Sequence, residues 1–98
     1  MRDAKRQIER SLATTRAAIE QSARIRERQE KELAAAEELH RIVTDEYGAG
    51  EATALEVDAA FADWQQAQQN LERETLRDQR LRYRLRLLTG EDLWPDTP

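Results

Sequence analysis

The chain has 98 residues, of which 39% are hydrophobic and only 5% are aromatic. This length allows a single domain. A chain with so few large side chains cannot fill a broad globular core, and we therefore expect a narrow seam between helices. Charged residues form 37% of the chain against three glycines and two prolines, a composition typical of coiled coils or long helices. The formal net charge of -4 gives no overall reason to expect a nucleic-acid partner.

Cysteine is absent, which excludes disulfides, thiolate metal sites and cysteine nucleophiles but leaves the redox compartment open. No apolar run approaches the roughly 20 residues that cross a bilayer as a helix. The N-terminal sequence also lacks the apolar centre of a signal peptide. We therefore expect no direct membrane contact from these residues.

The first predicted element is one helix over residues 3–46, because neither glycine nor proline occurs there and Asp3 can serve as the N-cap. Counting Ile8 as heptad position a gives a diluted apolar seam along positions a and d, with further seam residues at e. The a positions are Ile8, Thr15, Ser22, Gln29, Ala36 and Val43, the d positions are Ser11, Ala18, Ile25, Glu32, Leu39 and Glu46, and the e positions include Leu12, Ile19, Leu33, His40 and Tyr47.

This seam is weakest from Arg26 to Glu32, where alternating charges replace apolar residues. Pairs spaced i,i+4, such as Arg26 with Glu30, can support the helix there. The segment opposite, residues 71–74, is also charged, so we expect cross-helix ion pairs of small individual worth.

A turn over residues 47–52 follows and contains two of the three glycines. Gly48 and Gly50 can adopt positive φ at little steric cost, which suits a helix end and a tight reversal. Thr53 and Glu56 then match a capping box, in which the Thr53 hydroxyl accepts from the Glu56 amide and the Glu56 carboxylate reaches back to the Thr53 amide. The chain is therefore predicted to reverse here.

The second predicted helix covers residues 53–88 and carries its own seam at positions a and d, with Phe61 at e. When the chain folds back, opposed positions have numbers that total roughly one hundred, so that the small Ala36 faces the large Trp64. Both Trp64 and Phe61 are interpreted as seam residues. The fold class is thus predicted as all-α, a single antiparallel two-helix coiled-coil hairpin over residues 1–98. The a positions are Val57, Trp64, Leu71, Asp78 and Leu85, and the d positions are Ala60, Ala67, Glu74, Leu81 and Leu88.

The end of this helix contains residues 80–87, which alternate polar and apolar with the period of a strand. We predict helix there because the heptad pattern continues, no residue is β-branched, and arginines near a helix C-terminus favour the dipole. Gly90 is predicted as the C′ residue, and Pro95 and Pro98 prevent further helix, so residues 89–98 are predicted as an extended tail.

Few residues offer chemistry. Glu37 and His40 have the E-x-x-H spacing that supplies metal ligands in ferritin-like bundles, where Asp63 or Glu56 could add a carboxylate. With Leu39 at position d, however, Glu37 points outward, which favours an exposed acidic turn with a boundary histidine. No phosphate loop, zinc-ligand cluster or nucleophile elbow occurs. We therefore predict no catalytic residue, no metal and no cofactor.

Six arginines gather toward the C-terminal end of the second helix, where they could be read as a patch for nucleic acid or anionic lipid. They are spread around the helix and diluted by acidic neighbours, which favours a solvated or ion-paired face. These residues are Arg73, Arg77, Arg80, Arg82, Arg84 and Arg86.

An ordered set of residues runs through the turn and the second helix. Its first part is Tyr47, Gly50, Thr53, Glu56, Val57 and Ala60, and its second part is Ala67, Leu71, Leu81, Leu85, Leu88, Thr89, Gly90, Asp92 and Leu93. The first part resembles the periplasmic hairpin tip of TolC-family outer-membrane efflux proteins. The second is similar to the end of that family's returning helix. About half of the chain carries the resemblance.

The resemblance implies a hairpin excised from the α-helical barrel of an efflux duct, a non-enzymatic conduit in the periplasmic portion of an outer-membrane protein. It also implies that the tip docks onto a periplasmic adaptor protein. Glu51 stands where the family pattern is usually apolar. The residues implied for docking are Tyr47, Ala49, Gly50, Glu51 and Thr53.

Two alternatives remain open at this point: an unrelated coiled-coil interaction hairpin, which could be cytoplasmic, and a metal-binding dimeric bundle. In any of these cases we expect self-association into a homo-oligomer. Leu55, Leu76, Tyr83 and Leu87 fall off the seam without an intramolecular partner, and burying them requires another copy, most simply in a four-helix bundle.

Overall fold

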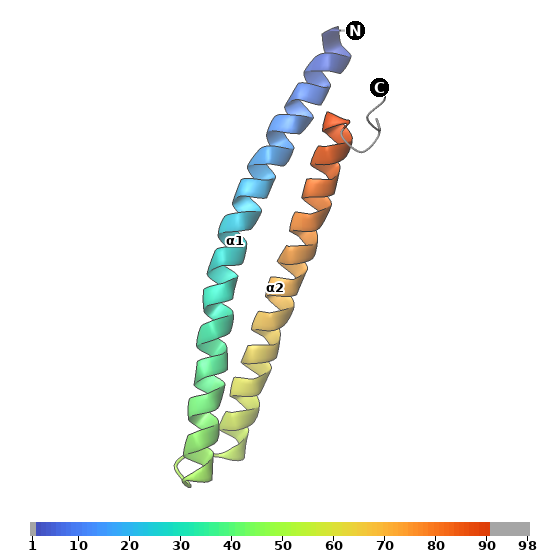
Figure 1. Cartoon of the computed structure of the whole chain (residues 1–98). Helices are drawn as coiled ribbons and strands as arrows, with labels where there is room; N and C mark the ends of the chain where they lie inside the picture. Colours follow the sequence, from blue (N-terminus) through green and yellow to red (C-terminus); the bar gives the residue numbers. More distant parts are fainter. Residues whose placement is uncertain (1, 91–98) are drawn as a thin grey trace, which may run out of the picture.

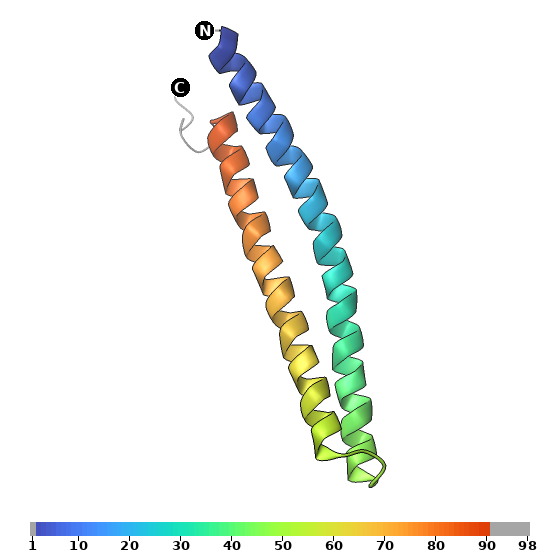
Figure 2. The same cartoon turned by 180° about the vertical axis from the view of Figure 1, so that it is seen from behind.

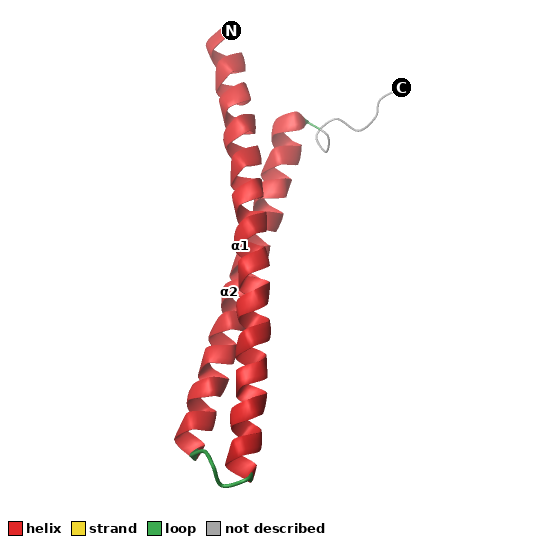
Figure 3. Cartoon of the chain, turned by 90° about the vertical axis from the view of Figure 1, so that its left-hand side faces the viewer, coloured by secondary structure: helices red, strands yellow, loops and turns green. Residues whose placement is uncertain are grey.

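The computed structural model describes residues 2–90. Two helices, α1 (Arg2–Gly48) and α2 (Ala54–Thr89), pack antiparallel as a hairpin (Figure 1). The molecule is a rod with principal extents of 71 × 29 × 15 Å. The same arrangement is seen from behind (Figure 2), and the side view shows the helices crossing at a shallow angle above the turn that joins them (Figure 3). The predicted all-α hairpin is confirmed.

The helix ends lie within two residues of the predicted ones, with differences at the caps. Asp3 lies in the first turn of α1 and is not the N-cap, although its negative charge still favours the helix dipole there. Residues 80–87 are helical, as predicted, and Gly90 caps α2 with φ 77° while its amide donates to the carbonyls of Arg86 and Leu87. The tail predicted over residues 89–98 is wrong at its start, because Thr89 is the last residue of α2 and Gly90 is its cap. Residues 91–98 lie outside the described residues.

The seam of α2 follows the predicted a and d positions, where Ala60, Glu74 and Asp78 are buried. The seam of α1 is rotated toward positions a and e: His40 at e is half-buried, whereas Leu39 at d is 49% exposed. A straight α-helix drifts by about 20° per heptad against a 3.5-residue repeat, so the buried stripe moves along a long helix. The prediction that d lines the seam of α1 is therefore wrong at Glu32 and Leu39, which are exposed, whereas Glu46 at d is half-buried.

The residues that face each other across the two helices are shifted by about one helical turn from the predicted pairing. The His40 ring packs against Trp64 at 5.1 Å between centroids, and Arg26 forms a cross-helix ion pair with Asp78 at 3.6 Å. The expected i,i+4 pair of Arg26 with Glu30 does not form, because Asp78 offers a less exposed partner. Exposed pairs along α1 instead join Arg28 with Glu32 and Lys31 with Glu27.

Candidate functional site: the hairpin tip

The tip comprises residues 47–53, and two backbone hydrogen bonds close the end of α1 there. The Glu51 amide donates to the Glu46 carbonyl at 2.7 Å, and the Gly50 amide donates to the Tyr47 carbonyl at 3.1 Å. This is the pattern of a Schellman motif with Gly50 at C′. Gly50 has φ 80°, a left-handed conformation that only glycine adopts without strain.

The two glycines of the turn differ in role. Positive φ was expected for both, yet Gly48 is the last residue of α1 and has helical geometry, so that expectation is wrong for Gly48. The reversal needs one left-handed residue, and Gly50 supplies it. A Cβ added at either glycine would meet nothing within 4 Å, so the conformation at Gly50, and not the space around it, restricts this position within the chain.

The start of α2 is capped by Thr53, as predicted. Its hydroxyl accepts a hydrogen bond from the Glu56 amide at 3.1 Å, and its own backbone is extended. The other half of the predicted capping box does not form: among the described residues, the Glu56 carboxylate accepts no hydrogen bond from the Thr53 amide. The cap thus satisfies one orphan amide of the helix and leaves the Glu56 carboxylate exposed.

The structure brings the five residues implied for docking together at one end of the rod. All five are exposed, with Tyr47 at 51%. Two helices of 47 and 36 residues hold them in place. The tip therefore presents a fixed, solvent-facing surface whose side chains contribute little to the packing between the helices. The five residues are Tyr47, Ala49, Gly50, Glu51 and Thr53.

An aromatic cluster lies next to the tip and fixes the two helices against each other. The His40 ring lies 5.6 Å from Phe61 and 5.1 Å from Trp64, and the Phe61 and Trp64 rings meet edge to face at 6.0 Å. Such geometry stabilises aromatic pairs beyond the area they bury. His40 thus serves as a packing residue, and the seam role predicted for Trp64 and Phe61 is consistent with this cluster, although Phe61 remains 43% exposed.

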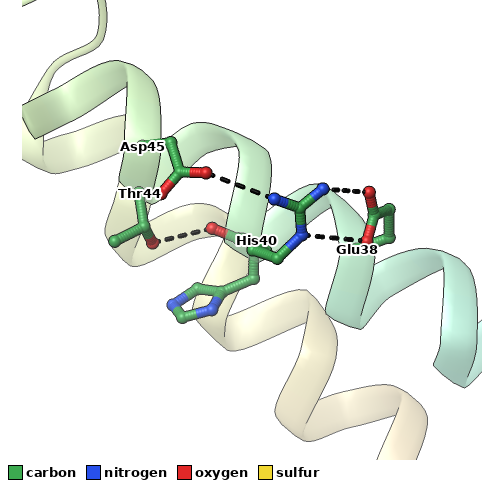
Figure 4. A network of polar contacts seen from close by, with 5 residues as sticks. Glu38, His40, Thr44 and Asp45 are labelled. Atoms are coloured by element: carbon green, nitrogen blue, oxygen red, sulfur yellow. Dashed lines mark hydrogen bonds and ion pairs between the residues drawn. The ribbon is translucent and has the colours of Figure 1, made fainter. Parts of the chain in front are cut away.

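Arg41 organises a polar network on α1 with Glu38 and Asp45, both of which are labelled in Figure 4. Its guanidinium binds the Glu38 carboxylate through two nitrogens, and a third contact reaches Asp45 at 3.3 Å. The hydrogen bonds from Arg41 lower the pKa of the Glu38 carboxyl below its ordinary value. This network was not predicted from the sequence, although acidic residues three before and four after an arginine have the spacing that produces it.

A shallow hollow of about 380 Å³ lies between this network and the aromatic cluster. Its walls include Trp64 and Thr44, whose hydroxyl donates to the His40 carbonyl at 2.7 Å. The E-x-x-H pair is present here as Glu37 and His40, but neither Asp63 nor Glu56 joins it. Among residues 2–90 no group of three or more potential metal-ligating side chains is assembled.

The seam away from the tip contains a polar layer. Asp78, only 5% exposed, accepts from Arg82 at 2.9 Å and pairs with Arg26 at 3.6 Å. Ser22 is fully buried, and its hydroxyl oxygen has no hydrogen-bond partner among the described residues. Asp78 Oδ1 likewise lacks one, as does Gln29 Oε1. Buried polar groups that lack partners lower stability, so this layer contributes less to the fold than a well-packed apolar one would.

Comparison with the models of known protein families, with curated proteins and with solved structures gives no match for this chain. Within residues 2–90, neither helix combines the length and the apolar content that spanning a membrane requires.

Proposed function

We propose that this chain is a helical-barrel segment of a TolC-like outer-membrane efflux duct, a non-enzymatic periplasmic conduit whose tip docks onto an adaptor protein. The observation that supports the docking role best is the conformation of Gly50 at the apex of a rigid hairpin. Its φ of 80° and the open space around it leave the backbone accessible to the backbone of a partner.

The charge of the tip end supports a basic partner. Residues 37–66 contain eight acidic side chains and one basic one, Arg41. Glu46 and Glu51 occupy the two positions of the Schellman motif that are usually joined by an apolar contact. A partner tip that carries lysine or arginine would neutralise these carboxylates, and such exposed contacts weaken as salt rises.

The outer faces of the hairpin support its place in a larger helical assembly. Leu55, Leu76 and Tyr83 remain 78%, 53% and 54% exposed, because the single seam with α1 does not reach them. Leu87, which was expected to be free of intramolecular contact, is half-buried. A helix in a barrel packs against two neighbours, and an apolar outer face on α2 fits that requirement.

The docking proposal is tested by measuring the affinity of wild-type chain and variants for the adaptor hairpin encoded in the same operon. Gly50→Val should block close approach and strain the turn by about 1–3 kcal/mol, and Glu51→Lys should repel a basic partner tip. Gly48→Ala is the matched control, because position 48 is helical and open. Unchanged affinity in both tip variants, with helix content intact, would show that the turn is only a connector.

A second candidate is an unrelated protein-interaction hairpin, which could be cytoplasmic. The exposed apolar residues Leu55, Leu76 and Tyr83 on α2 favour it, because an apolar outer face marks a protein-interaction surface without requiring a barrel. The sequence of the full-length gene separates the two candidates. A second copy of the tip motif flanked by alternating strands supports the duct, and its absence supports the independent hairpin.

A further inference from the structure

The two ends of the hairpin carry opposite net charge, although the net charge of the whole chain is small. The tip end, residues 37–66, carries eight acidic side chains and one basic one. The open end, residues 2–26 and 76–90, carries twelve basic side chains and four acidic ones. These two groups lie at opposite ends of a rod 71 Å long, with the N-terminus and the end of α2 at the same end (Figure 1). One end of the molecule therefore attracts the other end of a second molecule.

A second longitudinal stripe lies on α2, opposite the seam with α1. It follows heptad positions c and f, so it repeats with the spacing of a coiled-coil seam. Nine of its ten residues are exposed, and Leu87 is half-buried. Its two ends are apolar except for Arg80, and its middle is polar. This outer stripe consists of Leu55, Ala59, Ala62, Gln66, Gln69, Arg73, Leu76, Arg80, Tyr83 and Leu87.

We infer that two copies of this chain pair through the outer stripes of α2 and run in opposite directions, so that the tip of each lies beside the open end of the other. The stripe extends over about 48 Å at the rise of an α-helix. In this arrangement its apolar ends superimpose: Leu55 faces Leu87 of the second copy, and the small Ala59 faces Tyr83 of the second copy. Each contact occurs twice because the pair has two-fold symmetry.

The residues that flank the stripe favour this direction. Glu56, Asp63, Arg77 and Arg84 occupy heptad position g, next to the stripe. In an antiparallel coiled coil, flanking residues of this kind pair with the same position on the second helix. This pairing brings Glu56 to Arg84 of the second copy and Asp63 to Arg77 of the second copy. Glu56 and Asp63 are exposed and form no ion pair among the described residues. Arg77 contacts Glu74 at 3.4 Å and keeps 48% of its side chain exposed, so it can still reach an outside carboxylate.

Pairing in the same direction would have the opposite consequence. It would place Glu56 and Asp63 beside the same acidic region of the second copy, and Arg77 and Arg84 beside the same basic region. Like charges that face each other along a helix pair select against that arrangement. The direction is therefore set by electrostatics, and the apolar ends of the stripe supply the contact.

Opposite-direction pairing and a barrel are alternative uses of the outer stripe, because copies whose tips all meet one adaptor must run in the same direction. Pairing through this stripe therefore belongs to the chain outside a barrel and does not depend on docking of the tip to an adaptor. It concerns the outer stripe of α2, whereas adaptor docking concerns residues 47–53. Gly50→Val tests the separation, because it alters the tip and leaves every stripe residue unchanged. It should leave pairing of the two copies unaffected even where it abolishes adaptor binding.

Sedimentation equilibrium of the full chain at several salt concentrations tests the charge pairing. We expect a dimer whose dissociation constant rises about tenfold between low and molar salt, because exposed ion pairs are screened. The double variant Glu56→Arg, Asp63→Arg should be monomeric at concentrations where wild type is dimeric, as should Arg77→Glu, Arg84→Glu. An equimolar mixture of the two double variants should restore the dimer. A wild-type chain that stays monomeric at high micromolar concentration, or a dimer that salt does not weaken, would overturn the inference.

Disulfide trapping determines the direction, and the absence of native cysteine makes it clean. A mixture of the Leu55→Cys and Leu87→Cys chains should form a disulfide between the two variants under mild oxidation. Each variant alone should remain largely reduced, because opposite-direction pairing separates identical ends. Rapid formation of a Leu55→Cys homodimer, without the mixed product, would show that the copies run in the same direction.

Discussion

The polar layer of the seam leads to a prediction about Asp78, whose carboxylate serves two arginines. Asp78→Asn keeps the shape of the side chain and removes the charge that Arg26 and Arg82 face at 3.6 and 2.9 Å. Breaking a fully buried ion pair costs about 3–5 kcal/mol. Here the arginine side chains are 27% and 55% exposed, so water screens the loss, and we expect destabilisation of about 1–2 kcal/mol.

Urea unfolding followed by circular dichroism at 222 nm, at one fixed protein concentration, measures this change. A double-mutant cycle with Arg26→Gln isolates the coupling between Arg26 and Asp78 from other effects of each substitution. Arg28→Gln is the matched control, because its pair with Glu32 is exposed on both sides and should contribute less than about 0.5 kcal/mol.

Two results would refute this reasoning. If Asp78→Asn and Arg28→Gln change the free energy of unfolding equally, burial does not make the Asp78 ion pairs contribute more to stability than an exposed pair. If the cycle shows no coupling between positions 26 and 78, the contact at 3.6 Å does not contribute to stability. By contrast, replacement of both Arg26 and Asp78 by leucine should be neutral or stabilising, because an apolar pair avoids the desolvation of two charges.

Three further substitutions test local features of the hairpin. Thr53→Ala should lower the free energy of unfolding by about 1 kcal/mol, measured by urea denaturation, through loss of the helix cap. Ser22→Ala should raise it by about 1 kcal/mol, since it removes a buried hydroxyl without a partner, and a loss of stability would reveal a hydrogen bond from that hydroxyl. Because Arg41 lowers the pKa of Glu38, their contact adds stability above the ordinary glutamate pKa that is lost as pH falls through the lowered value. Glu38→Gln should therefore reduce the fall in stability on acidification, as followed by thermal melts across that range.

Much of the fold was predictable because its signals are local. A long stretch without glycine or proline predicts α1, and Thr53 and Gly90 mark the ends of α2 through cap chemistry that involves neighbouring residues. The left-handed conformation of Gly50 was predictable for the same reason. The tip residues implied by the resemblance are adjacent in sequence, so any hairpin with this turn would expose them together.

Other features depend on the packing of two helices and could not be read from either one. Whether position d or e of α1 faces α2 depends on how far a nearly straight helix drifts from the heptad repeat, so the exposure of Leu39 was not foreseen. The partner of Arg26 depends on a shift of one helical turn in register, which moves Asp78 within reach. The sequence predicted both hydrogen bonds of the capping box and could not show that only one of them forms. The bond to the Thr53 hydroxyl follows from the backbone geometry of the cap, whereas the bond to the Glu56 carboxylate does not.

The composition of the seam leads to the final prediction, that folding and association are linked. Ala60 is the only buried hydrophobic residue among residues 2–90, whereas Thr15, Ser22, Glu74 and Asp78 are also buried there. A seam whose larger apolar residues are only half-buried contributes less to stability than a closed core, so covering the exposed apolar residues of α2 should add a large share. The melting temperature should therefore rise with protein concentration, as mass action requires when only the folded chain associates. Thermal melts over a hundredfold concentration range measure this. A constant melting temperature would show that the isolated hairpin folds without a partner, which would remove the energetic argument for assembly.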